Sequence, residues 1–450
     1  MSNFFAPRTS PGSQPGIKSA LATKELKDAT DLAVGRFWFD ANLPFNAARS
    51  KFLQPMADGI AAVGPGYKMP SYHDLRGKIL GKIVVEVNGF MEHYKSCWSE
   101  TGCSVMADGW TDERQRTLIN FLVYCPKGVM FLKSVDTSPI IKNSDALFKI
   151  FDEIVLLVGP NNIVQFITDN DATYKVAGKR LAEKYGTFYW TACAAYCIDL
   201  MLEDMAKPHL FPVNAYTIET ARKITKFIYN HLSVLNLMRR EYTNGRELIR
   251  PAITRFATNF ISLQCLFKYR KEIRQMFTST AWDESNASST PVGMEITEII
   301  LNNTFWKDVE HILKVSEALV VVLRLADSEE KPAMGYVYEA MDRAKEVIQK
   351  RLKNKDYQIY WKIIDRRWEN QLHSALHAAA YYLNPAFFFS PTFSKHSEVM
   401  RGLNNVIEKL VPDFDTQDMI FKQCDAYKDS RFDFGSAAAT RNRKKMSPGK

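Results

Sequence analysis

Apolar residues recur at helical spacing along the first hundred residues of the chain. Between residues 30 and 62 they keep this spacing with a break at Asn42-Leu43-Pro44, and Gly64-Pro65-Gly66 ends the stretch. We predict a helical N-terminal segment over 25–100, preceded by a flexible lead-in over 1–24 that is rich in Pro, Gly, Ser and Thr. A second apolar helix face within this segment consists of Ile79, Leu80, Ile83, Val84, Val87, Phe90, Met91 and Tyr94.

The pattern changes to short apolar runs at Cys103. The runs CSVMADGW, LINFLVYC and VMFLKSVDT are partly β-branched and predict three strands, with a turn at 126–128 between the last two. Residues 144–158 have a helical pattern with Ser144 as the cap, and the buried strand IVQFITDN follows. A helix over 172–185, the run FYWTACAA and the helix CIDLMLEDMAK complete the order β-β-β-α-β-α-β-α. This order predicts an α/β core over 101–208.

The second half of the chain has an almost wholly helical periodicity. The polar stretch DESNASST at 283–290 interrupts it and predicts a loop. We predict a long helical region over 209–427 and a basic tail over 428–450. A chain of 450 residues, 46% of them hydrophobic, exceeds what one core usually holds, so we expect two or three packed units.

Charge and cysteine content restrict the class of protein. The chain has 59 Lys and Arg against 50 Asp and Glu, and the net charge of +9 favours a polyanionic partner such as nucleic acid. The seven cysteines are scattered, with no paired Cys/His spacing, so we predict a reducing compartment and no structural zinc. No apolar run is long enough to cross a membrane, and the N-terminus lacks the pattern of a secretory signal. We expect a nuclear protein, with the cytoplasm as the alternative.

Two aspartates lie at the ends of predicted strands. Asp108 ends the first strand, and Asp169 ends the strand that returns through one crossover helix. Such a crossover commonly sets a strand parallel to an earlier one, which would bring the two carboxylates together. A carboxylate pair can bind Mg²⁺, as half of a two-metal site for phosphodiester cleavage. The alternative is that Asp-Gly and Asp-Asn simply form turns here.

Several motifs occur in an order that resembles one protein family, the hAT transposase superfamily. More specifically, the chain resembles a plant branch of this superfamily that carries a domain of unknown function. The resemblance implies a ribonuclease H-like mixed sheet, interrupted by a large all-helical insertion and preceded by an N-terminal helical segment. The motifs are LPFNAARSKF (43–52), GPGYKMPS (64–71), MADGWTD (106–112), FITDN (166–170), WTACAAYCIDLMLED (190–204), TRFAT (254–258), KPAMGYVYEAMDRAKE (331–346) and RRWENQLHSALHAAAYYLNP (366–385).

The resemblance assigns roles to individual residues. Asp108 corresponds to the first acidic residue of the transposase triad and Asp169 to the second, and both would bind the metal. Cys193 matches the Cys of a family Cys-x-x-His pair, but Tyr196 stands at the His position. A phenol cannot readily shuttle a proton near neutral pH, which an imidazole can do. The third family carboxylate, a Glu in a C-terminal dimerisation segment, and the N-terminal BED zinc finger have no counterpart in this sequence.

Three further groups of residues are candidates for binding. Arg255 and Phe256 match a family Thr-Arg-Trp motif that contacts DNA, and Phe256 can either stack on a base or pack in the core. A basic cluster can act as a nuclear-import signal or phosphate contact, or it can be a solvated tail; it consists of Arg441, Arg443, Lys444 and Lys445. His373 and His377 lie four residues apart, which we expect to place them on one helix face, in a packing or capping role.

These observations leave three hypotheses. The favoured one is a transposase-derived protein, domesticated or truncated, that binds DNA weakly and largely without sequence specificity and does not cleave it. The second is an active metal-dependent nuclease core that needs a C-terminal segment for its third carboxylate. The third is a protein-interaction scaffold without DNA binding. Protein partners or a homo-oligomer are compatible with all three, and Mg²⁺ is expected to bind weakly at Asp108 and Asp169.

Overall fold

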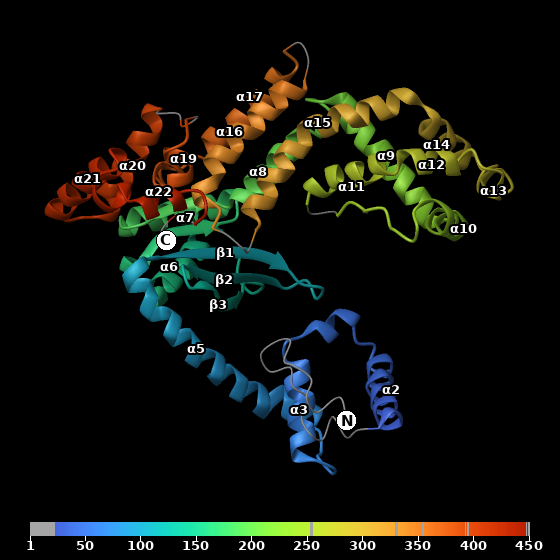
Figure 1. The fold of residues 1–450 in the computed structure, drawn as a ribbon, viewed down its shortest axis with the longest axis horizontal. Coiled ribbons are helices and arrows are strands. Elements are labelled where there is room, and N and C mark those ends of the chain that lie inside the picture. Colours follow the sequence, from blue (N-terminus) through green and yellow to red (C-terminus); the bar gives the residue numbers. More distant parts are fainter. Residues whose placement is uncertain are drawn as a thin grey trace. The chain divides into compact units, whose positions relative to one another are not determined.

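The computed structural model divides the chain into two units, Met1–Asn88 and Gly89–Lys450. Figure 1 shows the elements of both units with the labels used below. Within the residues that the structure describes, no helix combines the length and the apolar composition that a membrane span needs. The described residues are 23–141, 143–252, 255–328, 332–352, 355–391, 393, 396–446 and 448.

The N-terminal unit is helical, as predicted. Thr23 caps its first helix by accepting a hydrogen bond from the Leu26 amide, and the break predicted at 42–44 separates that helix from the next turn. Gly64 ends the third element at a φ of 87°, a conformation that favours glycine. None of the described residues of this unit is buried. Its elements are α2 (Lys24–Asp40), η2 (Phe45–Arg49), α3 (Leu53–Val63), α4 (Tyr72–Asp74), η3 (Leu75–Ile79) and the start of α5 (Leu80–Thr101).

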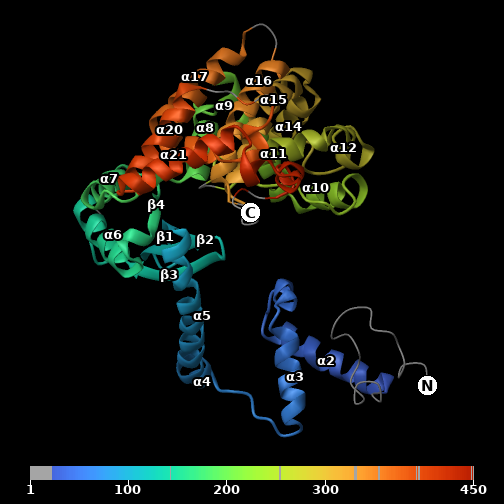
Figure 2. The same cartoon turned by 60° about the vertical axis from the view of Figure 1, so that its left-hand side comes forward.

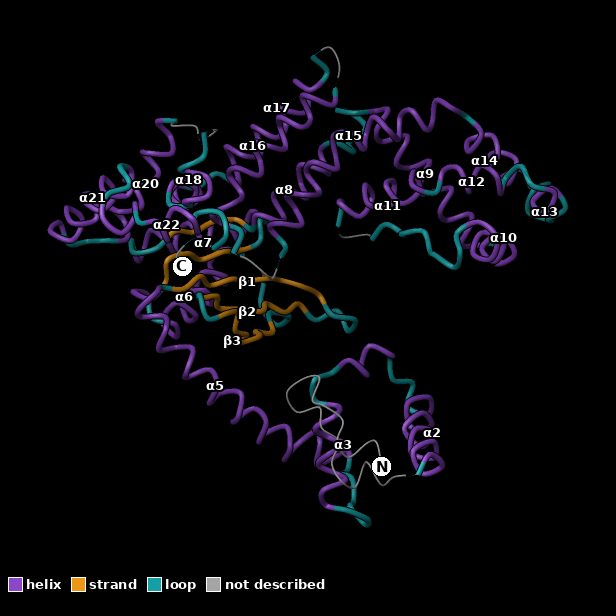
Figure 3. Tube along the Cα trace, viewed as in Figure 1, coloured by secondary structure: helices purple, strands orange, loops and turns teal. Residues whose placement is uncertain are grey.

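A five-stranded mixed sheet forms the first part of the second unit. Its strand order is β3-β2-β1-β4-β5. Strand β2 is antiparallel to both β1 and β3, whereas β4 is parallel to β1 and β5 is parallel to β4. Figure 3 shows the strands in orange. The predicted succession of strands and helices is therefore confirmed. The strands are β1 (Cys103–Thr111), β2 (Thr117–Cys125), β3 (Gly128–Asp136), β4 (Ile163–Thr168) and β5 (Tyr189–Ala192).

Helices α6 (Ser144–Val158) and α7 (Ala172–Tyr185) pack together beside the sheet (Figure 2). Alternate residues of the strands, such as Val105 and Phe121, are fully buried in the core that these helices share with the sheet. The strands were predicted from short, partly β-branched apolar runs, and the burial of alternate residues is what the pleat of a strand imposes. The cap of α6 is Asn143 and not Ser144 as predicted, because the Asn143 Oδ1 atom accepts from the Ala146 amide at 2.9 Å.

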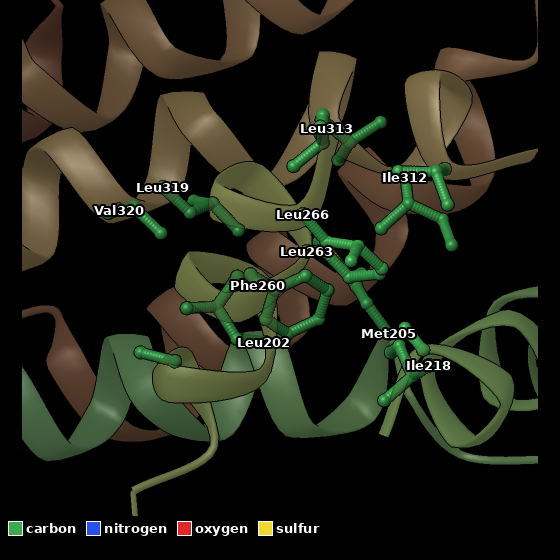
Figure 4. Packing of buried hydrophobic residues seen from close by; sticks show 14 of the residues in the cluster. Leu202, Met205, Ile218, Phe260, Leu263, Leu266, Ile312, Leu313, Leu319 and Val320 are labelled. Atoms are coloured by element: carbon green, nitrogen blue, oxygen red, sulfur yellow. The ribbon is translucent and has the colours of Figure 1, made fainter. Parts of the chain in front are cut away.

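A long helical region follows the sheet. Apolar side chains from α8, α9, α11 and α15 meet in its core (Figure 4). The predicted loop at 283–290 corresponds to the turns between α13 and α14. The helices are α8 (Ala194–Asp204), α9 (Pro212–Asn230), α10 (Leu232–Leu237), η5 (Met238–Tyr242), α11 (Ala257–Lys268), α12 (Arg270–Met276), α13 (Thr280–Asp283), α14 (Pro291–Leu301), α15 (Asn303–Ala326), α16 (Met334–Arg351) and α17 (Tyr357–Arg367).

The last helices of the chain share an aromatic cluster. Tyr381 and Tyr382 of α18 are buried in it, together with Tyr427 of α21. The basic tail is partly helical, since α22 includes Arg441. These elements are η6 (Trp368–Leu372), α18 (Ala375–Tyr382), α19 (Pro385–Phe388), α20 (Ser397–Leu410), α21 (Phe414–Lys428), η7 (Phe432–Gly435) and α22 (Ala437–Asn442).

Candidate functional site

The two predicted metal-binding aspartates come directly after the last paired residues of two neighbouring parallel strands, β1 and β4. The last paired residues of β1 and β4 are Ala107 and Thr168. Asp108 follows Ala107, and Asp169 follows Thr168. Asp108 does not end its strand as predicted, because β1 continues to Thr111, whereas Asp169 is the first residue after β4. The charges of both carboxylates act on Cys193, so both lie near that residue. The prediction that the two strands are parallel neighbours is confirmed.

The electrostatic surroundings of Asp108 leave it poorly neutralised. Asp108 keeps access to solvent, yet partial burial raises the pKa of its carboxyl above the usual value. The positive charge of Arg255, from the segment before α11, opposes this rise in pKa only in part. Arg255 is thus the predicted DNA-binding residue that the fold brings close to a predicted metal ligand.

Cys193 and Tyr196 also lie beside the carboxylates. Burial raises the pKa of the Cys193 thiol, backbone amides of Ala195 and Tyr196 oppose this, and the charges of Asp169 and Asp108 add to it. Burial likewise raises the pKa of Tyr196, and the Asp169 carboxylate is the next cause. Both groups therefore stay protonated at neutral pH. The phenol of Tyr196 can donate a hydrogen bond there, but it cannot act as a base.

Arg255 and Phe256 are held at the start of α11. Phe256 is half-buried, and its amide donates to the Asp199 Oδ2 atom at 3.1 Å. The next amide, that of Ala257, donates to the Asp199 Oδ1 atom at 2.7 Å. Asp199 is the middle residue of α8, and sequence reasoning missed it. The only signal was a charged residue within an apolar helix. Thr254, the first residue of the motif, lies outside the described residues.

A second chain of polar contacts runs from the sheet edge into α8. Asn170, next to Asp169, donates through its side-chain amide to Gln371 at 3.0 Å, and Gln371 accepts from Arg367 at 3.2 Å. Arg367 in turn binds the buried Asp204 carboxylate through two nitrogens, at 2.8 and 2.9 Å. These contacts connect the RRWENQ motif to the end of β4. Sequence reasoning did not find them.

Close packing supports the same edge of the sheet. The Trp190 indole donates to the Thr168 hydroxyl at 3.0 Å and lies against Gly178 of α7. A Cβ atom at Gly178 would lie 2.1 Å from the indole ring, so any other residue at this helix position would force the Trp190 side chain to move. Trp190 therefore packs, as expected for a large aromatic residue at a strand end.

The other predicted residues have structural surroundings of their own. The Arg443 guanidinium lies 3.5 Å from the centroid of the Phe389 ring and donates to Ser430 at 2.9 Å, so it is not part of a fully solvated tail. Arg441, Lys444 and Lys445 are exposed.

The histidine pair differs from its prediction. His373 and His377 do not share one helix face, because His373 ends the π-helix η6 in an extended conformation and His377 belongs to α18. Burial is the main cause that lowers the pKa of His377 to about 4, and the neighbouring His373 lowers it further. His377 is therefore a neutral core residue at pH 7.

The chemistry of the carboxylate pair fits a magnesium ion. Mg²⁺ takes one or two carboxylate oxygens and fills its other positions with water or phosphate oxygens. Asp108 and Asp169 offer such a pair, and the raised pKa of Asp108 indicates a carboxylate whose charge the fold does not fully compensate. Over the described ranges, no group of three or more His, Cys, Asp or Glu side chains is placed to hold a metal ion.

The fold and this site together define an α/β protein whose mixed sheet fits a ribonuclease H-like core with a helical insertion. Residues 70–224 match the family model of the domain of unknown function DUF659, a domain found in hAT-type transposase-like proteins. The matched span contains the whole sheet together with Asp108, Asp169, Cys193 and Tyr196. No curated protein matches the chain at a significant level.

Proposed function

We propose that this chain is a nuclear protein derived from a hAT transposase, and that it binds DNA without cleaving it. The observation that carries the proposal is the register of β1 and β4, whose last pair, Ala107 and Thr168, comes directly before Asp108 and Asp169. The match to a transposase-associated domain over the same residues supports it. The plant origin implied by the sequence motifs belongs to the same proposal.

DNA binding is supported by charge and by the position of Arg255. The side chain of Arg255 is 75% exposed and forms an ion pair with Asp327 at 3.9 Å, which leaves the guanidinium accessible to a phosphate. The net charge of +9 favours a polyanion in general. These features carry no base-specific information, so we expect weak binding that depends little on sequence.

The carboxylate pair would hold Mg²⁺, and the bound ion would supply charge neutralisation for a DNA phosphate. Asp108 and Asp169 would bind the ion, while Arg255 would contact the backbone. Tyr196, at the family His position, is not suited to accept a proton near neutral pH, because burial and the charge of Asp169 raise its pKa above that of an ordinary phenol. This is the residue-level support for binding without cleavage.

The test is DNA binding measured between 50 and 200 mM salt, for the unmodified chain and for Arg255→Ala. The logarithm of affinity should fall steeply with the logarithm of salt, and the variant should lower this slope by about one phosphate contact. Arg401→Ala is the matched control, because Arg401 is an exposed arginine of α20. A flat salt response of the unmodified chain would contradict the proposal and favour a scaffold without DNA binding.

A further inference from the structure

We infer that Asp199 is a positioning residue: it fixes the Arg255-Phe256 segment beside the carboxylate pair and thereby sets its DNA contact. The inference rests on the proposed function and extends it to a residue of the 190–204 motif to which the sequence analysis gave no role. It starts from the two amide hydrogen bonds that the Asp199 carboxylate accepts.

The start of α11 has no cap of its own. Phe256 occupies the N-cap position and makes no side-chain cap, so the first amides of this 12-residue helix need acceptors from elsewhere. Asp199 offers one carboxylate oxygen to each of two successive amides, although it is 57 and 58 residues away along the chain. A carboxylate is well suited to this place, since the N-terminal end of a helix carries partial positive charge.

The same bonds fix where Arg255 lies. The Phe256 amide belongs to the peptide that joins Phe256 to Arg255, so its bond to Asp199 holds that peptide directly. The Thr258 hydroxyl donates to the Arg255 carbonyl at 2.6 Å, which holds the other atom of the same peptide. With its backbone held at both atoms, the Arg255 side chain has a fixed origin.

Asp199 is also anchored to the site on its other side. It lies three residues after Tyr196 on α8, and α8 follows β5 directly. The Cys193 amide, at the start of that helix, donates to the Thr168 carbonyl at the end of β4 at 2.9 Å. A short covalent and hydrogen-bonded route thus connects the end of β4 to Arg255 through Asp199. A residue that only stabilised α11 would not need to lie on this route.

The experiment compares Asp199→Ala with Thr290→Ala. Thr290 caps α14 in the same helical region by accepting from the Gly293 amide at 3.0 Å, so both variants remove a helix cap. Both should lower the melting temperature, because loss of a cap destabilises a helix. Only Asp199→Ala should weaken DNA binding and lower the salt slope by about one phosphate contact, as Arg255→Ala does. Adding Asp199→Ala to Arg255→Ala should change the slope no further.

A second variant keeps the test valid if Asp199→Ala folds poorly. Asp199→Asn retains one acceptor oxygen, so it should restore part of the stability and part of the salt slope. Overturning results are an unchanged slope in both Asp199 variants, or an equal loss of DNA binding in Thr290→Ala.

Amide exchange separates this inference from the proposed function. If the unmodified chain shows no salt-dependent DNA binding, the proposed function fails, and hydrogen exchange at 255–258 decides the positioning role. Faster exchange there in Asp199→Ala, with no change in Thr290→Ala, supports a fixed segment. Unchanged exchange in Asp199→Ala overturns it.

Discussion

Asp204, the last residue of α8, and Asp108, within β1, are both aspartates of the second unit, and the fold surrounds the two carboxylates differently. Asp204 is 1% exposed and accepts hydrogen bonds from Lys207, Arg366 and Arg367 at 2.7 to 2.9 Å. Asp108 is exposed, and Arg255 is the positive charge that acts on it. One carboxylate is compensated inside the fold, and the other is left for a cation from outside.

The pKa values of the two carboxyls differ in direction for this reason. Burial alone would raise the pKa of Asp204, but hydrogen bonds from Arg367 and Lys207 and their charges outweigh it and lower the pKa to about 2. Partial burial raises the pKa of Asp108, because Arg255 compensates it only in part. The comparison suggests that the number of bonded cations separates a structural aspartate from a functional one in this chain.

The largest effect is expected from Asp204→Ala. Removing this carboxylate leaves the cations of Lys207, Arg366 and Arg367 without their shared partner. Arg367 is only 15% exposed, but water can solvate the other two, so we expect a loss of about 3 kcal/mol, the lower end of the range for a broken buried pair. Urea denaturation should show this loss in the unfolding free energy. Asp108→Ala is the matched control and should change stability much less. Equal losses of unfolding free energy in Asp204→Ala and Asp108→Ala would show that the two carboxylates do not differ in their contribution to stability.

The pH dependence of stability should carry the signature of Asp204. Its pKa is about 2 in the folded protein and 3.8 as the reference value, so the folded state favours the ionised form. This contribution of about 2 kcal/mol is fully present above pH 3.8 and is lost as the pH falls toward 2. The difference in unfolding free energy between the unmodified chain and Asp204→Asn should therefore shrink between pH 6 and pH 2.5. A constant difference would show that Asp204 is not ionised in the way proposed.

A smaller effect of opposite sign is expected from Asp108→Asn. The substitution removes a charge that partial burial disfavours and keeps the shape of the side chain, so the unfolding free energy should stay within about 0.5 kcal/mol or rise slightly. Mg²⁺ provides the second measurement. The ion should raise the melting temperature of the unmodified chain and have less effect on Asp108→Asn. A clear loss of stability in Asp108→Asn without Mg²⁺ would mean that Asp108 is a structural residue like Asp204.

The sequence was sufficient for features that depend on local periodicity. Short apolar, partly β-branched runs predicted the strands, and one crossover helix was enough to predict that β1 and β4 are parallel neighbours. It was not sufficient for contacts made across long distances along the chain. Asp204 accepts a hydrogen bond from Arg366, which is 162 residues away along the chain, and Asp199 accepts one from Phe256, which is 57 residues away. Such partners depend on how α8 packs, which periodicity does not reveal.

Local chemistry also misled at two places. Ser144 and Asn143 are both good caps, and only the backbone at Asn143, which is extended, allows its side chain to reach the helix amides. His373 and His377 have helical spacing, but the π-helix η6 ends at Leu372 and breaks the face. Sequence spacing assumes a continuous helix, and it fails where the helix changes its hydrogen-bonding pattern.

The last prediction is that no activity will be observed: this chain should not cleave DNA in the presence of Mg²⁺ or Mn²⁺. Two-metal cleavage needs both ions fixed between several ligands, and a misplacement of about 1 Å can lower the rate about a hundredfold. Asp108 and Asp169 supply one carboxylate pair, and Tyr196 has a raised pKa that prevents proton transfer near neutral pH. Tyr196→His would restore a group that titrates near pH 6.5 but would add no metal ligand from a carboxylate, so this variant should also be inactive.

The measurement is nicking of supercoiled and transposon-end DNA by the unmodified chain, Tyr196→His and Asp108→Ala. Cleavage by the unmodified chain that disappears in Asp108→Ala would make this protein an enzyme. Cleavage gained only by Tyr196→His would show that two carboxylates hold the metal well enough, and that the missing proton carrier alone separates this site from an active one.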